Sequence, residues 1–78
     1  MSSMNDRAAE IDRMLAEQGF PNAMRRSDAC RAIGVHHDTL RKLRKDGEIT
    51  SISVRGQFVY RRVDVATFIA LGEKGGGQ

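Results

Sequence analysis

Residues 28–43 constrain the fold of this chain most, because a single glycine there separates two short helical patterns. Ala29 and Cys30 precede the glycine, and two helices that cross closely need small side chains where their backbones approach. Gly34 can adopt a positive φ without steric penalty, which suits a tight turn. The apolar residues that would fill the angle between the helices are Ile33, Val35, Leu40 and Leu43. The segment predicts a helix-turn-helix, and taken alone it also fits an ordinary helical hairpin.

The two helices of this segment have recognisable ends. Ser27 is a suitable N-cap for a first helix over residues 28–33, because its hydroxyl can accept a hydrogen bond from the first turn. A second helix is predicted over residues 37–45, with its two leucines facing inward and four cations on its other faces. The Asp46-Gly47 pair ends this second helix.

A longer amphipathic helix is predicted near the N-terminus, over residues 4–18. Its apolar stripe consists of Ala8, Ile11, Met14 and Leu15. Gly19 ends the helix, and residues 20–24 form a connector that includes Pro21. We expect the stripe to pack on the rest of the domain, because short isolated helices are marginal in water. The alternative is that it packs on a partner chain.

Two short strands of a β-hairpin are predicted over residues 52–54 and 58–60. A three-residue loop between them would place four large apolar side chains on one face, packed on the helices. The expected pairs are Val54 with Phe58 and Ile52 with Tyr60. A last helix is expected over residues 63–71, ended by Gly72.

The distribution of charge indicates the kind of partner. The net charge is +3 over 78 residues. Residues 1–24 hold two Lys or Arg against four Asp or Glu, and residues 63–78 hold one against two. Residues 25–62 hold ten cations against four acids, a local charge of +6. A basic centre is the footprint of a phosphate-binding surface, although a solvated basic face has the same composition.

Length and composition exclude several classes of protein. A chain of 78 residues is one domain, with little room for an enzyme pocket. The sequence has no apolar run near the ~20 residues that span a membrane and no signal-peptide segment, so we expect a cytoplasmic protein. The single cysteine, Cys30, cannot form an internal disulfide, which suits a reducing compartment.

A family resemblance rests on an ordered set of residues, Gly34-Val35, Thr39-Leu40, Gly47, Gly56, Asp64 and Phe68-Ile69. In this order, residues 24–71 resemble the excisionase group of MerR-type winged helix-turn-helix proteins. The chain departs from that pattern twice. His36 stands where the family often has Ser or Thr before the recognition helix, and Thr50 stands where it often has Pro. The resemblance implies a mainly α fold with a β-hairpin wing over residues 24–71. Outside it, residues 1–23 are expected to form an extra helix and connector, and the glycine-rich, polar composition of the last residues predicts a disordered tail over residues 72–78.

The resemblance also implies how the chain would contact DNA, with the second helix in the major groove. The residues expected to read bases are His37, Asp38, Arg41 and Lys42. Arg41 is the best direct reader, because its fork matches O6 and N7 of guanine. The residues expected on the DNA backbone are Arg25, Arg26, Arg44, Lys45, Arg61 and Arg62. At the wing tip, Arg55 and Gln57 are expected to reach the minor groove.

Metal, cofactor and catalytic roles find no support in the sequence. His36 and His37 are adjacent and point in different directions, and Cys30 falls in the predicted core without a second cysteine. A buried apolar thiol is also inert as a redox sensor. The chain has no Ser/His/Asp set and no glycine-rich phosphate loop, so we expect neither a cofactor nor an enzyme activity.

The leading functional hypothesis is a recombination directionality factor, encoded by a phage or bacterium and associated with the nucleoid. It would bind and bend attachment-site DNA and direct an integrase or recombinase, and copies could associate on DNA. One alternative is a small transcriptional regulator of a phage or mobile element. Others are the DNA-recognition domain of a phage packaging protein and a protein-interaction adaptor that uses its N-terminal helix.

Overall fold

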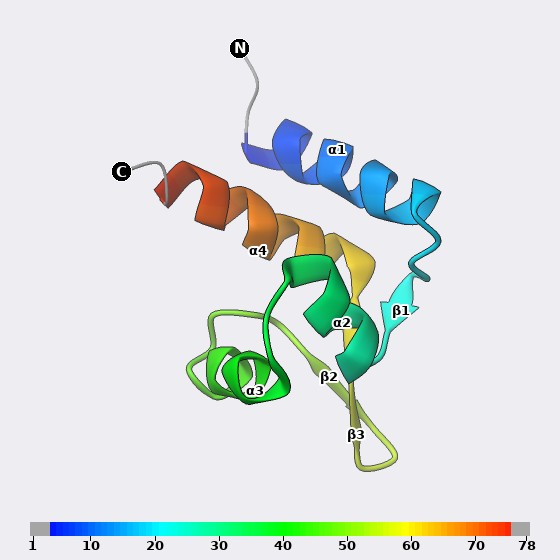
Figure 1. The fold of residues 1–78 in the computed structure, drawn as a ribbon, viewed down its shortest axis with the longest axis vertical. Helices are drawn as coiled ribbons and strands as arrows, with labels where there is room; N and C mark the ends of the chain where they lie inside the picture. Colours follow the sequence, from blue (N-terminus) through cyan, green and yellow to red (C-terminus); the bar gives the residue numbers. More distant parts are fainter. Residues whose placement is uncertain (1–3, 76–78) are drawn as a thin grey trace.

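Helices make up most of the chain, and a small antiparallel sheet joins them (Figure 1). The computed structural model describes residues 4–75, with the side chains of residues 6–72. In chain order these residues form α1 (Met4–Glu17), β1 (Ala23–Met24), α2 (Arg26–Ile33), α3 (His37–Lys45), β2 (Ile52–Val54), β3 (Gln57–Arg61) and α4 (Arg62–Gly75). The strands are ordered β1-β3-β2. The expectation of a mainly helical fold with a β-hairpin is confirmed.

Helix α1 lies side by side with α4, and the two helices run in opposite directions (Figure 1). Ile11 and Leu15 are each 5% exposed, so these two residues of the predicted stripe lie in the core of the same chain. Met14 is 46% exposed and lies on the outer side of the helix instead. After α1 the Phe20 N–H donates to the carbonyl of Leu15 at 3.0 Å, which turns the chain back toward the domain.

The α2–α3 pair follows the predicted pattern closely. Gly34 has φ +85°, a left-handed conformation that favours glycine, and α3 covers the predicted residues 37–45. Helix α2 begins before its predicted start, and the expected cap at Ser27 is wrong. Arg25 is the N-cap and makes no side-chain capping bond; its carbonyl accepts from the Ala29 N–H at 2.9 Å. His36 caps α3 through Nδ1, which accepts from the Asp38 N–H at 3.3 Å.

The hairpin has a different register from the predicted one. The observed pairs are Ile52 with Val59, Ser53 with Phe58 and Val54 with Gln57. Arg55 and Gly56 have φ of +51° and +80° and form a two-residue turn, because positive φ at both positions gives the twist that joins two strands. Side chains alternate along a strand, so this register keeps Tyr60 buried but turns Ile52 and Val54 to the opposite face. The predicted three-residue loop is wrong.

Two further boundaries differ from the sequence predictions. The connector over residues 20–24 contains β1, which pairs with β3 through Ala23 opposite Arg61 and Met24 opposite Tyr60. Helix α4 continues through Gly72 to Gly75, so the predicted helix end and the start of the predicted tail are wrong. A helix tolerates an interior glycine at a cost of about 1 kcal/mol relative to alanine. Residues 76–78 of the predicted tail lie outside the described residues.

One apolar cluster fills the space between the helices and the sheet. Its buried members are Ile11, Leu15, Met24, Ala29, Cys30, Leu40, Ile49, Tyr60, Val65, Ala66 and Ala70. The predicted placement of Cys30 in the core is confirmed, and burial raises the pKa of its thiol. Among the described residues, no helix is long and apolar enough to cross a bilayer.

Candidate nucleic-acid interface

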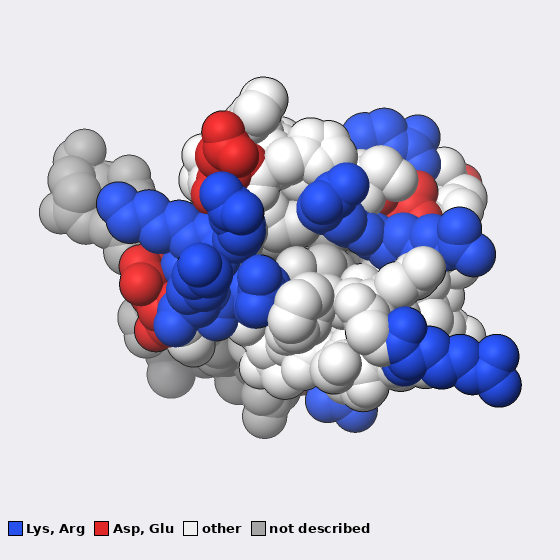
Figure 2. All heavy atoms as spheres, turned by 90° about the horizontal axis from the view of Figure 1, so that it is seen from below, with Lys and Arg blue, Asp and Glu red and all other residues white. Residues whose placement is uncertain are grey.

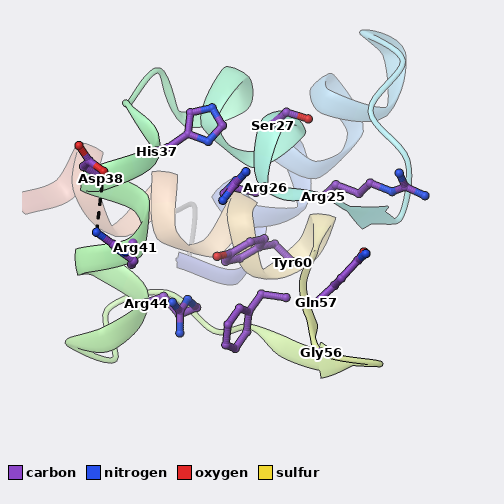
Figure 3. A pocket seen from close by; sticks show the side chains of 11 residues that line it. Arg25, Arg26, Ser27, His37, Asp38, Arg41, Arg44, Gly56, Gln57 and Tyr60 are labelled. Carbon is purple, nitrogen blue, oxygen red and sulfur yellow. Dashed lines mark ion pairs between the residues drawn. The ribbon is translucent and has the colours of Figure 1, made fainter.

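A cleft of about 560 Å³ opens between α3, the start of α2 and the β2–β3 hairpin (Figure 3). Its lining comes from all three elements: Arg25, Arg26, Ser27, His37, Asp38, Arg41, Arg44, Gly56, Gln57, Phe58 and Tyr60. The α2–α3 turn sets one wall, and β3 supplies the opposite wall. Four arginines on two segments of the chain, the start of α2 and α3, therefore face one space.

Three of the four residues predicted to read bases line this cleft from α3. His37, Asp38 and Arg41 lie toward its open end in Figure 3, and all three are exposed. Arg41 Nη2 lies 4.0 Å from Asp38 Oδ1, so the acid is a local charge partner of the arginine. Lys42, the fourth predicted reader, is exposed but does not line the cleft.

The residues predicted to contact the DNA backbone divide into two groups. Arg25, Arg26 and Arg44 line the cleft, and Lys45 is exposed on α3 outside it. Within the part of the chain that the structure describes, no carboxylate lies within ion-pair distance of these three arginines. No carboxylate of the described chain therefore neutralises the positive charges of these three arginines.

The other group, Arg61 and Arg62, makes hydrogen bonds within the chain. Arg61 Nε donates to Asp64 Oδ2 at 2.7 Å, and this hydrogen bond raises the pKa of the guanidinium. Arg62 Nε donates to Asp12 Oδ1 at 2.7 Å, and its Nη1 donates to the Phe20 carbonyl at 2.9 Å. Neither arginine lines the cleft, and the contacts of Arg62 join α4 to α1 instead.

The wing-tip residues are also separated. Gln57 lines the cleft, whereas Arg55 lies in the two-residue turn outside its lining. Arg55 has φ +51° and an exposed side chain, so the turn presents its charge to solvent. The tip thus carries one cation beyond the cleft itself.

Two aromatic residues in the cleft had been assigned only to the core by the sequence pattern. Tyr60 is 2% exposed and forms the floor, and burial raises the pKa of its hydroxyl while Arg44 opposes that shift. Phe58 is 41% exposed, and the Cζ atom of Arg44 lies 3.7 Å from the centre of its ring. The alternation of the two aromatics along a strand beside a basic helix is the sequence signal that could have placed both here.

The charged side chains around the cleft are unevenly distributed over the surface. Figure 2 views the molecule from below Figure 1, where α3 and the hairpin lie, and shows Lys and Arg side chains in separate groups around an uncharged middle. A few acids lie beside these groups in the same view. The face therefore combines positive charge at its edges with uncharged surface between them.

Among the described residues, no cluster of three or more His, Cys, Asp or Glu side chains is arranged to hold a metal ion. The cleft lining offers guanidinium and hydroxyl donors, one amide and one carboxylate, which is chemistry for binding an anion. Comparisons of the chain with models of known protein families, with curated proteins and with solved structures found no match.

Proposed function

We propose that this chain binds double-stranded DNA as a winged helix-turn-helix protein. Helix α3 would enter the major groove, α2 would lie across the backbone, and the β2–β3 hairpin would act as the wing. The tight turn at Gly34 and the exposed polar face of α3 support this reading. Among the predicted base readers, Arg41 lies where α3 faces the cleft, and its planar fork suits guanine.

One observation carries the proposal: three arginines without carboxylate partners, Arg25, Arg26 and Arg44, converge on one cleft. Mutual repulsion among such cations destabilises the folded chain, and a polyanion relieves it. DNA presents a regular row of negative charges and suits several cations spread over the start of α2 and α3. A cytoplasmic, nucleoid-associated protein would meet this ligand.

For the biological role we propose a recombination directionality factor, with an integrase or recombinase as protein partner. This part of the proposal is supported by the excisionase resemblance of residues 24–71. Footprinting on the DNA of the element that encodes the chain tests it. Tandem protected sites at an attachment region are expected, whereas a single protected site over a promoter would assign the chain to transcriptional regulation.

Binding itself is tested with fluorescently labelled 30-base-pair duplexes, one pool of random sequence and one site selected from it. The wild-type chain should bind both, more weakly as salt rises, because phosphate contacts release counterions. Arg41→Ala should lower discrimination between the two by about 1–3 kcal/mol, the contribution of one bidentate contact to guanine. Arg13→Ala, on the exposed side of α1, is the control and should change neither affinity.

Two outcomes would count against this reading. If Arg41→Ala weakens binding to both duplexes equally, Arg41 contacts a phosphate rather than a base. If the wild-type chain binds neither duplex at low salt, the DNA-binding proposal fails as a whole.

A further inference from the structure

One corner of the cleft differs chemically from the rest of it. It consists of Arg26, Arg44, Phe58 and Tyr60, and is called the Arg44 corner below. Phe58 and Tyr60 are two positions apart on β3 and therefore point to the same side of the sheet. Arg26 on α2 and Arg44 on α3 both lie close enough to the Tyr60 hydroxyl for their charges to act on it, and the Arg44 guanidinium lies over the Phe58 ring. The corner thus places two cations over an aromatic floor.

Arg44 is held in one orientation in this corner. Its guanidinium carbon lies 3.7 Å from the centre of the Phe58 ring, which is the distance of direct stacking. The side chain is half-buried, whereas the other cations of α3 are exposed. A stacked guanidinium keeps its N–H groups in the plane parallel to the ring, so they remain available to an acceptor at the edge. Less rotamer entropy is then lost when an anion binds.

Leaving part of the Phe58 ring exposed to water costs free energy, and packing within the chain gives no reason for that exposure. It is 41% exposed, in a cleft, on a strand whose neighbouring aromatic is fully buried. An apolar ring beside a guanidinium group, in a cleft that a second arginine also lines, suits a ligand with an anionic part and an apolar part side by side. A phosphate joined to a deoxyribose has this composition, because the sugar presents C–H groups and the phosphate presents oxygens.

The acid that lines the cleft does not compensate this corner. Asp38 is paired with Arg41, and no ion pair joins it to Arg26 or Arg44. Elsewhere in the described chain, arginines such as Arg31 and Arg61 do have carboxylate partners. Arg26 and Arg44 line the cleft and have no carboxylate partner among the described residues.

We infer that the Arg44 corner binds one phosphate–deoxyribose unit of a DNA strand, with the phosphate between Arg26 and Arg44 and the sugar against Phe58. Phe58 acts as a positioning residue that holds Arg44 for the phosphate. The inference rests on the proposed DNA binding and adds to it a defined backbone subsite, which is indifferent to base sequence because guanidinium donors meet phosphate oxygens only.

Three variants separate the charge of Arg44 from its orientation, measured on the random-sequence duplex across a salt series. Arg44→Gln removes the charge and should lower both the affinity and the salt slope, the slope by about one unit. Arg44→Lys keeps the charge but not the planar stack, and Phe58→Leu keeps an apolar side chain but not the ring. Each of these two should weaken binding by about three- to tenfold, the range of a partly exposed cation–π contact, at unchanged slope.

The double variant Arg44→Lys with Phe58→Leu should lose less than the product of the single losses, since both changes break the same stack. Arg13→Lys is the matched control, because it makes the same Arg-to-Lys exchange at an exposed position of α1 outside the cleft, and it should bind as the wild type does. Thermal melts of each variant establish that it is folded before its affinity is compared. Selected and random duplexes should be weakened by the same factor.

Failure of the subsite is distinguishable from failure of DNA binding. If the wild type binds duplex DNA and Phe58→Leu binds equally well, the positioning role is overturned. If Arg44→Gln also retains the wild-type slope, no phosphate lies in the corner. If the wild type binds no duplex at low salt, both proposals are wrong.

Discussion

The two sides of the molecule use arginine in opposite ways. On the α1–α4 side, Arg62 is 18% exposed at its side chain and bonds to Asp12 and to the Phe20 carbonyl, so its charge is neutralised where it joins two helices. On the α3–hairpin side, Arg26 and Arg44 face a cleft without a carboxylate partner among the described residues. The same residue type serves the fold on one side and lies open to an anion on the other.

The apolar residues show the same division. On the α1–α4 side Ile11 and Leu15 are buried, whereas around the hairpin Ile52, Val54 and Phe58 are each more than 40% exposed. Burial of apolar surface stabilises a fold by about 25 cal/mol per Å², so the hairpin contributes less to stability than its composition would allow. The α1–α4 side therefore contributes more to the stability of the fold, whereas the α3–hairpin side exposes more charged and apolar surface.

The largest expected effect tests whether the α1–α4 side holds the fold together. Leu15→Ala should lower the free energy of unfolding by about 2–5 kcal/mol, because it leaves a cavity in the core. Met14→Ala, at the neighbouring but exposed position, should cost far less. Urea unfolding followed by circular dichroism measures both. Similar small losses in the two variants would mean that α1 is not packed on α4 in solution.

A smaller effect is expected from the arginine that joins the helices. Arg62→Met should destabilise the chain by about 1.5–3 kcal/mol, because it leaves the half-buried Asp12 carboxylate without its charged donor. Arg61→Met is the matched control: Arg61 is exposed in its pair with Asp64, and the change should matter much less. A double-mutant cycle with Asp12→Asn measures the coupling. Equal losses from both arginine variants would remove the distinction between the two.

The sequence pattern predicted the α2–α3 pair well because local rules decide it. Gly34 supplies the positive φ that the turn requires, and the apolar spacing around Leu40 fits a helix with that leucine on its buried face. The stripe of α1 was likewise predictable, since Ile11 and Leu15 share one helix face. In the candidate site, the cations of α3 and α2 were identified because charge content is read directly from the sequence.

The hairpin register was not predictable by the same reasoning. The sequence argument assumed that Ile52, Val54, Phe58 and Tyr60 would all be buried, whereas the two-residue turn at Arg55-Gly56 separates them. Turn geometry therefore prevailed over apolar patterning. The role of Arg62 depends on Asp12, fifty positions earlier, and β1 is too short to show periodicity. Such long-range partners are outside the reach of spacing arguments.

On the α3–hairpin side, the cation at the tip of the hairpin is Arg55. Arg55→Asn should reduce the salt slope of duplex binding by about one unit, because it removes one cation from the tip. Asparagine adopts positive φ readily, so the turn should fold at least as well as in the parent chain. Arg55→Lys retains the charge and should keep the slope. If both variants bind as the wild type does, the hairpin tip does not touch DNA.

The smallest expected effect concerns alkaline pH. Burial raises the pKa of the Cys30 thiol above 9.0 and that of the Tyr60 hydroxyl above 10.0, and both groups lie beneath the α3–hairpin side. Above these ordinary values the unfolded chain loses the two protons before the folded chain does. The free energy of unfolding should therefore be constant below about pH 9 and fall as the pH rises beyond it.

Cys30→Ala and Tyr60→Phe should each flatten this fall in thermal melts between pH 8 and about pH 11, even though each also lowers the stability at neutral pH. Met14→Ala leaves both groups in place and should keep the parent slope, whereas a slope unchanged in all three variants would mean that neither proton is held more tightly by the fold.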